Sequence, residues 1–374
     1  MKIRHDLKSS NTKIKYLARW NESASIGVIN KIKNTTSALS SNGYQAEHDI
    51  VHKDGILGHL LLPLRIMQCR ADLLIVRATA FSMLLCSFPL LIQRLKGKKI
   101  VIDVPTPLVS VLEEINGSSK SKFKKFILRT LIKINYPLAL YVAHRVIQYS
   151  EESPRFLLGI KRKTFMGANG VDVSSIKLRN KKNTQSDSLT LIGVAALEKW
   201  HGYDRVIQGI SNYYKNINSK QKTNVNFIIV GSGSVEQNLK TMAHDLEVAQ
   251  YIHFKGTLSG QALTDIFDEA DVAVASLGVH RKGLRIASDL KSREYLSRGF
   301  PILVSAEDPD IPHTLEFIYG SPADDSAIDI ENLLEWHKSY TSISNEPETL
   351  RAFALQHLDY KSKSMMYTKN LTRN

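Results

Sequence analysis

The sequence predicts an α/β protein made of two doubly wound, parallel-sheet domains. Short apolar runs alternate with longer segments of helical periodicity, and this alternation pauses at a polar stretch, Lys177–Ser188, before it starts again. The apolar runs are almost continuous in Val, Ile and Leu, which is typical of parallel strands covered by helices on both faces. The length of 374 residues suits two to three domains of ordinary size.

The first half of the chain is predicted to begin with a strand, a loop and a helix. Lys13–Ala18 is the strand, and the polar loop Asn21–Gly27 follows it. Apolar residues then recur at helical spacing until Gly43, a residue type suited to ending a helix. The later strands of this half are predicted at Asp72–Arg77, Lys99–Val104, Arg145–Ser150 and Thr164–Gly167.

The second half repeats the pattern after the polar stretch. Its strands are predicted at Leu189–Ala195, Val225–Gly231, Ile252–Gly256, Val272–Ala275 and Pro301–Ser305. Its helices are predicted near Asp204–Tyr214, Val235–Leu246, Gln261–Ala270 and Leu290–Arg298. We therefore expect a first domain over residues 1–180 and a second over 181–345, with a helical tail over 346–374 that could run back to the first.

Composition narrows the class of protein. Charged residues make up 23% and hydrophobic residues 43%, which excludes a disordered or fibrous chain. Two cysteines, without a Cys-x-x-Cys pair, argue against a disulfide-rich scaffold and a structural zinc site. The net charge of +14 favours anionic partners, but no nucleic-acid-binding motif occurs, so nucleic acid is not expected as a partner.

In two such domains, ligands are expected beyond the carboxyl ends of the strands, with the two sheets facing each other across a cleft. Gly231, Ser232 and Gly233 lie at such a position, after one strand and before a helix. Glycines there let backbone amides approach a phosphate, although a tight strand-to-helix turn explains them equally well.

A basic loop follows the predicted strand Val272–Ala275. Its residues include His280, Gly283 and Leu284, and its bases are Arg281, Lys282, Arg285 and Lys291. Such a loop suits a diphosphate, and Ser288 or Asp289 could cap the helix that it enters. Glu294, three residues after Lys291, is explained either as a surface ion pair or as an acceptor for ribose hydroxyls.

Five motifs in one order carry a family resemblance. They are Asn169–Asp172, the strand end Val230–Gly233, Phe254–Gly256, Ile266–Val272, and Glu294 with Gly299 and Pro301 after it. Together they resemble family 4 of the nucleotide-sugar-dependent glycosyltransferases, which have the GT-B fold. Within that family, the stretches Trp200–Arg205 and His280–Leu296 are similar to a bacterial branch that builds surface polysaccharide.

The resemblance implies roles for individual residues. Glu294 matches the second glutamate of the family's Glu-x7-Glu motif, which binds ribose. Ser25 and Gly27 match a glycine loop that faces the diphosphate, and Lys199 and His201 lie where the family carries basic residues. The first glutamate is replaced by Ile286, and the usual arginine after the first strand of the second domain is lost. Lys282 and Lys291 are therefore our candidates for neutralising the diphosphate and for the catalytic role.

The resemblance implies an anomer-retaining glycosyltransferase that needs no metal or other cofactor. Its donor would be a nucleotide-diphosphate sugar, with UDP favoured over GDP, and its acceptor a glycan or a lipid-linked glycan of bacterial polysaccharide or lipopolysaccharide assembly. Two alternatives stay open: a non-catalytic nucleotide-sugar-binding subunit, which the loss at Ile286 suggests, and a nucleotide-sugar epimerase on the same fold.

The chain is expected to be cytoplasmic, because its N-terminus is polar and its longest apolar stretches are short or interrupted. Six bases cluster among apolar residues between Lys120 and Lys133, and no carboxylate occurs from Ile115 to Ser150. An ordinary amphipathic helix explains this segment, and so does docking on the anionic inner face of the inner membrane.

Overall fold

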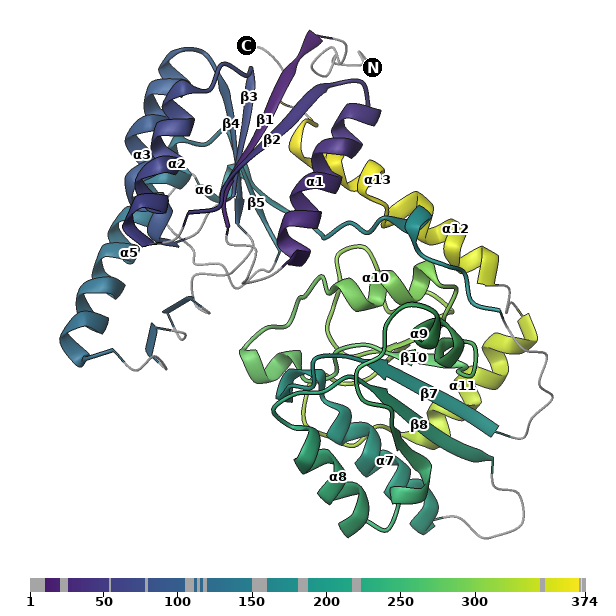
Figure 1. The fold of residues 1–374 in the computed structure, drawn as a ribbon. Coiled ribbons are helices and arrows are strands. Elements are labelled where there is room, and N and C mark those ends of the chain that lie inside the picture. Colours follow the sequence, from purple (N-terminus) through teal and green to yellow (C-terminus); the bar gives the residue numbers. More distant parts are fainter. Residues whose placement is uncertain are drawn as a thin grey trace. The chain divides into compact units, whose positions relative to one another are not determined.

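The computed structural model separates into two compact units. The first comprises residues 1–170 and 360–374, and the second comprises residues 171–359. The structure describes residues 11–20, 26–53, 55–77, 80–104, 111–112, 115–116, 120–149, 160–180, 188–216, 223–343, 347–369 and 371. Each unit is an α/β sandwich around one all-parallel sheet, as predicted, but each sheet has six strands where the sequence predicted five (Figure 1).

The sheet of the first unit has the strand order β2-β1-β3-β4-β5-β6. Its strands are β1 (Lys13–Arg19), β2 (Gln45–Val51), β3 (Leu73–Arg77), β4 (Lys99–Val104), β5 (Arg145–Gln148) and β6 (Thr164–Met166). Its helices are α1 (Ile26–Ser41), α2 (Gly55–Gln68), α3 (Ala80–Leu95), α5 (Lys122–Val142), α6 (Ile160–Lys163) and α13 (Tyr360–Ser364).

Alternate residues of the central strands of the first unit face opposite layers of helices. Leu74 and Val76 of β3 join the core beneath α2, α3 and α5. Leu73 and Ile75 join the core beneath α1 and the C-terminal residues, and α1 packs on α13 (Figure 1). Both faces are apolar because both are covered, as the near-continuous apolar strands predicted.

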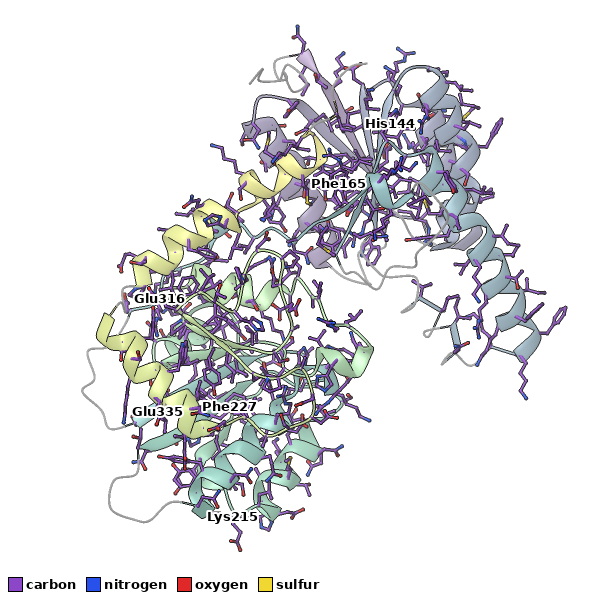
Figure 2. The ribbon with its side chains drawn as sticks, turned by 180° about the vertical axis from the view of Figure 1, so that it is seen from behind. His144, Phe165, Lys215, Phe227, Glu316 and Glu335 are labelled. Atoms are coloured by element: carbon purple, nitrogen blue, oxygen red, sulfur yellow. The ribbon has the colours of Figure 1, made fainter. Side chains whose placement is uncertain are left out.

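The sheet of the second unit has the order β12-β11-β10-β7-β8-β9. Its strands are β7 (Ser188–Val194), β8 (Asn224–Val230), β9 (Ile252–Phe254), β10 (Val272–Val274), β11 (Ile302–Val304) and β12 (Ile318–Gly320). Its helices are α7 (Tyr203–Asn216), α8 (Glu236–Asp245), α9 (Gly260–Phe267), α10 (Leu290–Ser297), α11 (Ile330–Ile343) and α12 (Pro347–His357). Phe227 lies in the core of this unit, whereas Lys215 is exposed at the end of α7 (Figure 2).

The division between the units falls earlier than the polar stretch predicts, after Gly170 rather than near residue 180. The reason is Arg179, whose buried guanidinium donates hydrogen bonds to the carbonyls of Gly299 (2.9 Å) and Ala270 (3.0 Å) inside the second unit. The expected tail over 346–374 is also divided, because α12 belongs to the second unit and only residues from Tyr360 onward belong to the first.

Candidate functional site

The strand order of the second unit marks one edge as the place for a ligand. The chain winds outward in opposite directions from β7 and β10, which are neighbours in the sheet. Ligands of doubly wound sheets bind beyond the carboxyl ends of the strands at this kind of reversal. The loops that leave β7 and β10, and helix α10 that follows the second loop, hold most of the residues that the sequence singled out. Lys199, His201, His280, Lys282, Gly283 and Leu284 lie in the loops, and Lys291 and Glu294 lie in α10.

Backbone hydrogen bonds join the two loops. The amide of Leu277 donates to the carbonyl of His201 (2.9 Å), and the amide of Gly278 donates to that of Trp200 (3.1 Å). Gly202 has a φ of 64°, and a Cβ at this position would lie 2.7 Å from the nitrogen of Gly278. The glycine therefore provides both a left-handed turn and room for the second loop.

His201 is a buried, neutral hydrogen-bond donor. Its Nδ1 accepts a hydrogen bond from the amide of Glu198 (3.1 Å), which leaves the ring proton on Nε2. Burial, together with the positive charges of Lys291 and Lys282, lowers the pKa of His201 to about 3, against a smaller opposing effect of Asp289. The ring consequently offers one N–H and no charge at neutral pH.

Lys291 carries a buried ammonium group. Its Nζ is inaccessible to solvent and has no hydrogen-bond partner among the described residues. Burial lowers the pKa of Lys291 to about 8, although the carboxylates of Asp289 and Glu294 oppose that shift. A buried cation without a hydrogen-bonded partner is unfavourable, and an incoming anion would relieve that cost.

Asp289 caps the start of α10, two residues before Lys291. The carboxylate of Asp289 accepts hydrogen bonds from the amides of Ser292 (2.9 Å) and, less closely, Ser276 (3.4 Å). Of the two caps that the sequence allowed, the structure therefore uses Asp289 and not Ser288. The same side chain attaches the first turn of α10 to the loop that leaves β10.

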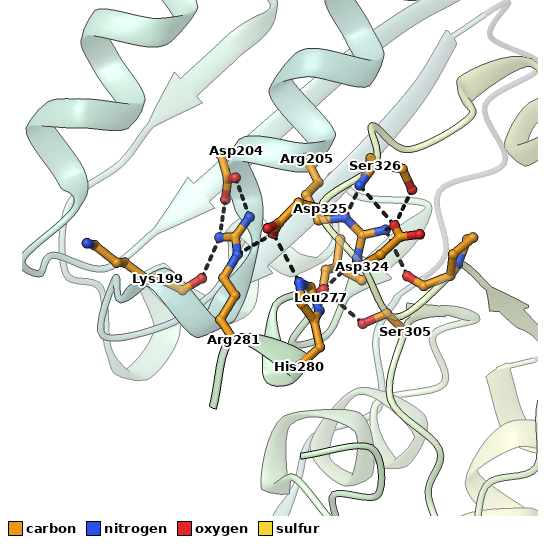
Figure 3. Close-up of polar contacts among 11 residues, drawn as sticks. Lys199, Asp204, Arg205, Leu277, His280, Arg281, Ser305, Asp324, Asp325 and Ser326 are labelled. Carbon is orange, nitrogen blue, oxygen red and sulfur yellow. Dashed lines mark hydrogen bonds and ion pairs between the residues drawn. The ribbon is translucent and has the colours of Figure 1, made fainter. Parts of the chain in front are cut away.

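Arg281 is the anchor of the basic loop (Figure 3). Its guanidinium binds both carboxylate oxygens of Asp204 (2.9 and 2.6 Å) and one oxygen of Asp325 (2.7 Å), and it donates to the carbonyl of Lys199 (2.7 Å). Nε2 of His280 lies 3.0 Å from the same oxygen of Asp325. Arg281 and His280 are therefore engaged within the protein, and the carboxylates that engage them were missed from sequence.

Lys282 extends from the same loop. The residue is exposed, and its Nζ lies 3.7 Å from the centre of the Trp200 ring, a cation–π contact. Gly283 ends the short helical turn with a φ of 69°, and Leu284 after it is half-buried. The positive charges of Lys282 and Lys291 both lower the pKa of His201, so both charges lie within electrostatic range of its ring.

Arg205 is a second anchor that sequence reasoning missed. Its side chain is fully buried and donates to the carbonyls of Leu277 (2.5 Å), Ser326 (2.7 Å) and Pro322 (2.9 Å). It thus fixes the loop after β10 to the segment before α11 (Figure 3). The available signal was the adjacent acid–base pair Asp204-Arg205 at the start of a helix.

Gly231 and Gly233 are explained by packing within the protein. A Cβ at Gly231, where φ is 120°, would lie 1.8 Å from the carbonyl oxygen of Ala195, and one at Gly233 would lie 2.2 Å from that of Leu197. The amide of Gly231 already donates to Gly256 (2.6 Å), and the Ser232 hydroxyl lies 3.2 Å from that of Thr257. The glycines permit close contact between two loops, and their role toward a phosphate stays a prediction.

Glu294 pairs with Arg298 rather than with Lys291. Its Oε1 accepts two hydrogen bonds from that guanidinium (3.0 and 2.8 Å), and Oε2 receives none from the described residues. The side chain is 39% exposed. Ile286, in place of the family's first glutamate, forms an isolated parallel bridge with Glu307.

The remaining predicted residues lie in the first unit. Gly27 belongs to the first turn of α1, and Ser25 lies outside the described residues. Among the residues that the structure describes, no three His, Cys, Asp or Glu side chains are grouped to hold a metal ion.

Two hollows adjoin the loops of the second unit. One of about 310 Å³ lies at the ends of β10 and β11 and is lined in part by Ser276, Asp289 and Ser292. The other, of about 630 Å³, is lined in part by Lys199, His201 and Met242. Both volumes include space that is open to solvent; the enclosed part is about 20 Å³ in the first hollow and about 230 Å³ in the second.

One family model matches part of the chain. Residues 174–315, which lie within the second unit and include both loops, match the family described as glycosyl transferases group 1. Over that range, the chain is similar to glycosyl transferases of group 1. No curated protein matches the chain by sequence.

Solved structures extend the similarity to both units. A glycosyltransferase from Rickettsia africae ESF-5 is 13% identical, with a TM-score of 0.60 over 96% of this chain and 99% of that one. The lipopolysaccharide outer core galactosyltransferase WaaB is 12% identical, with a TM-score of 0.58 over 95% and 99%. WaaG, a glycosyltransferase involved in lipopolysaccharide biosynthesis, is 11% identical, with a TM-score of 0.53 over 97% and 100%. At these identities the similarity establishes the fold, which is GT-B, as the sequence predicted.

Proposed function

We propose that this group 1-like protein transfers a sugar from a nucleotide-diphosphate sugar to a glycan or lipid-linked acceptor in bacterial polysaccharide or lipopolysaccharide assembly. One observation carries the proposal. Where β7 and β10 end, the buried ammonium of Lys291 has no hydrogen-bond partner among the described residues, and its charge acts electrostatically on the neutral imidazole of His201, which has one N–H to donate. That combination suits a ligand with several anionic oxygens.

The proposed chemistry places the diphosphate against Lys291, Lys282 and the Nε2–H of His201. Negative charge grows on the leaving diphosphate as the bond to the sugar breaks. Donors that are already fixed in position stabilise that charge more in the transition state than in the ground state, which accelerates the reaction. Arg281 and Asp289 hold the donors in place, so they act as positioning residues and not as catalytic residues.

Glu294 is proposed to receive hydrogen bonds from the ribose hydroxyls. Its Oε2 accepts no hydrogen bond from the described residues, whereas Oε1 is bound by the guanidinium of Arg298. UDP is favoured over GDP as the nucleotide. Retention of the anomeric configuration, independence of metal, and action in the cytoplasm or at the inner face of the inner membrane belong to the same proposal and rest on the family resemblance.

The deciding experiment measures binding and then chemistry. We expect UDP or GDP to bind the wild-type protein without added metal, in calorimetry with EDTA present. The matching nucleotide sugar should then be hydrolysed slowly when no acceptor is present. When an acceptor is added, NMR of the glycoside product should show the anomeric configuration of the donor. Binding without turnover across donors and acceptors would instead identify a binding subunit. Conversion of the nucleotide sugar without loss of its nucleotide would identify an epimerase.

A matched pair of variants tests the observation that carries the proposal. Lys291→Met keeps the length of the side chain and removes its charge, so we expect at least tenfold weaker nucleotide binding. Lys215→Met makes the same change at the exposed end of α7 in the same unit and should bind like the wild type (Figure 2). If both variants bind nucleotide with equal affinity, Lys291 is not part of the nucleotide-binding site.

A further inference from the structure

Three helices of the first unit are apolar on two opposite faces. One face of α2, α3 and α5 packs on the sheet, through residues such as Leu62, Leu90 and Leu140. The other face carries large apolar side chains in the open, although a helix of a water-facing layer normally presents polar residues there. The helices are packed side by side, α2 on α3 and α3 on α5 (Figure 1).

The exposed apolar residues follow helical spacing, so each helix presents a stripe. Fifteen of the nineteen exposed large apolar side chains among the described residues belong to these stripes, which makes them one surface rather than scattered positions. We call this surface the apolar face. Its members are Leu57, Leu60, Leu64 and Met67 on α2, Leu85, Phe88, Leu91 and Leu95 on α3, and Phe123, Phe126, Ile127, Leu131, Ile134, Leu138 and Tyr141 on α5.

The charges on these helices have one sign. The sequences of α2, α3 and α5 contain no Asp or Glu, whereas Lys122, Lys124 and Lys133 of α5 are exposed cations beside the apolar stripe. Arg65 and Arg94 add exposed bases on α2 and α3. An occupant of the apolar face must therefore be both apolar and anionic.

A second copy of this chain does not meet that requirement, because the same face of the copy also carries bases and its helices have no carboxylate to pair with them. An anionic bilayer does meet it, since it offers acyl chains to the apolar residues and lipid phosphates to the lysines. No helix in the described part of the chain is long and apolar enough to cross a bilayer. Because the three helices pack side by side and each carries an exposed apolar stripe, the fitting geometry is a helical layer that lies in the plane of the interface.

We propose that α2, α3 and α5 together form a membrane-docking surface that inserts its apolar face into an anionic lipid leaflet. This goes beyond the docking that the sequence predicted for the segment Lys120–Lys133, because two further helices contribute and because insertion, not charge alone, holds the protein there. Phe88 and Leu95 of α3, which are 69% and 79% exposed, and Phe123 and Phe126 of α5, which are 73% and 68% exposed, are the leading inserted residues.

The two contributions respond differently to salt. At 1 M salt the Debye length is about 3 Å, so attraction between the lysines and lipid phosphates is nearly lost. Burial of apolar side chains does not weaken in this way. We expect the full chain to cosediment with vesicles of phosphatidylglycerol and phosphatidylcholine at 0.1 M salt and to remain partly bound at 1 M.

Three variants separate the contributions. Phe88→Gln/Leu95→Gln/Phe123→Gln/Phe126→Gln should lower vesicle binding at least tenfold at both salt concentrations. Lys122→Glu/Lys124→Glu/Lys133→Glu should lose its binding chiefly at low salt. Met166→Gln/Leu355→Gln alters exposed apolar residues outside the apolar face and should bind like the wild type.

Each replaced side chain is exposed, so circular dichroism and melting temperatures should match the wild type. Wild-type binding by the four-residue glutamine variant would overturn the proposal, as would a wild-type dimer that this variant converts to monomers. The vesicle assay needs no nucleotide. Failure of nucleotide binding therefore leaves this inference standing, and failure of vesicle binding leaves the proposed function standing.

Discussion

Lys291 has a pKa of about 8, so the charge of the candidate site depends on pH within the range of ordinary assays. Below pH 8 the ammonium is charged and attracts a diphosphate, and above pH 8 it becomes neutral. We predict that affinity for UDP or GDP falls with rising pH, with a slope that approaches one decade per pH unit above 8. Calorimetry at pH 7, 8, 9 and 9.5 measures this.

Lys291→Arg is the control for that prediction, because an arginine stays charged throughout this range. Its affinity, whatever its value at pH 7, should hardly change up to pH 9.5. A wild-type affinity that is flat over the same range would show that another group binds the phosphates.

Glu294 should matter for binding and hardly at all for stability. The loss of a charged hydrogen-bond acceptor costs roughly 1.5–3 kcal/mol, so Glu294→Ala should bind nucleotide about tenfold or more weakly. Its partly exposed pair with Arg298 is an i,i+4 pair, a kind that contributes only about 0.3–0.5 kcal/mol to folding. Glu335→Ala, an exposed acid on α11, is the control for calorimetry and melting. If Glu294→Ala lowers the melting temperature but leaves nucleotide affinity unchanged, Glu294 serves only as an ion-pair partner of Arg298.

At the scale of elements, Asp289 links the stability of α10 to the electrostatics of the site. Loss of an N-cap costs roughly 1 kcal/mol, so Asp289→Ala should lower the melting temperature by about 2–4 °C. Asp289→Asn keeps a capping oxygen and should melt like the wild type. Both variants remove a carboxylate that raises the pKa of Lys291, so both should lose nucleotide affinity at a lower pH than the wild type. An unchanged pH profile in both would contradict this coupling.

The sequence predicted every central strand and two of the four edge strands, β6 and β9, but it missed the edge strands β2 and β12. β3 and β4 have neighbours on both sides and helices on both faces, so their sequences are mostly apolar. β2 and β12 pair with one neighbour each. β2 is mostly exposed or half-buried, and its polar sequence, with Glu47, His48 and Asp49, carries no strand pattern.

The sequence predicted residues that belong to the candidate site, but not which residues form hydrogen bonds and ion pairs with them. The sequence showed the loop after β10 as a run of bases. Its spacing could not reveal that Arg281 binds two carboxylates or that the ammonium of Lys282 lies over the Trp200 ring. Asp325 lies more than forty residues from Arg281 in sequence, and only the fold brings them together. The glycines after β8 were ambiguous for the same reason, because the loop that they accommodate follows a different strand.

At the scale of the whole molecule, the chain leaves the first unit and later returns to complete it. Tyr367 is buried in the core of that unit, and its hydroxyl lies 3.0 Å from that of Tyr149. The guanidinium of Arg145 in β5 donates to the carbonyls of Met366 and Lys369. Residues from Tyr360 onward are therefore a structural part of the first unit, although the second unit separates them from it in sequence.

This arrangement predicts that Tyr367→Ala destabilises the first unit by about 3–5 kcal/mol, as is usual when a buried aromatic ring is lost. Tyr367→Phe keeps the ring and should cost far less. Calorimetry should show an earlier transition for the first unit and an unchanged transition for the second. Nucleotide binding, which we assign to the second unit, should survive. A shift of both transitions by the same amount would show that the units unfold together.

The returning segment also sets an order in time. A ribosome completes all of residues 171–359 before it adds Tyr367, so the second unit has every residue of its core while the first still lacks part of its own. Domains usually fold in the order in which they are made, from the N-terminus. Here the unit that begins first is completed last. During synthesis, its core lacks Tyr367 until the ribosome has made the whole second unit.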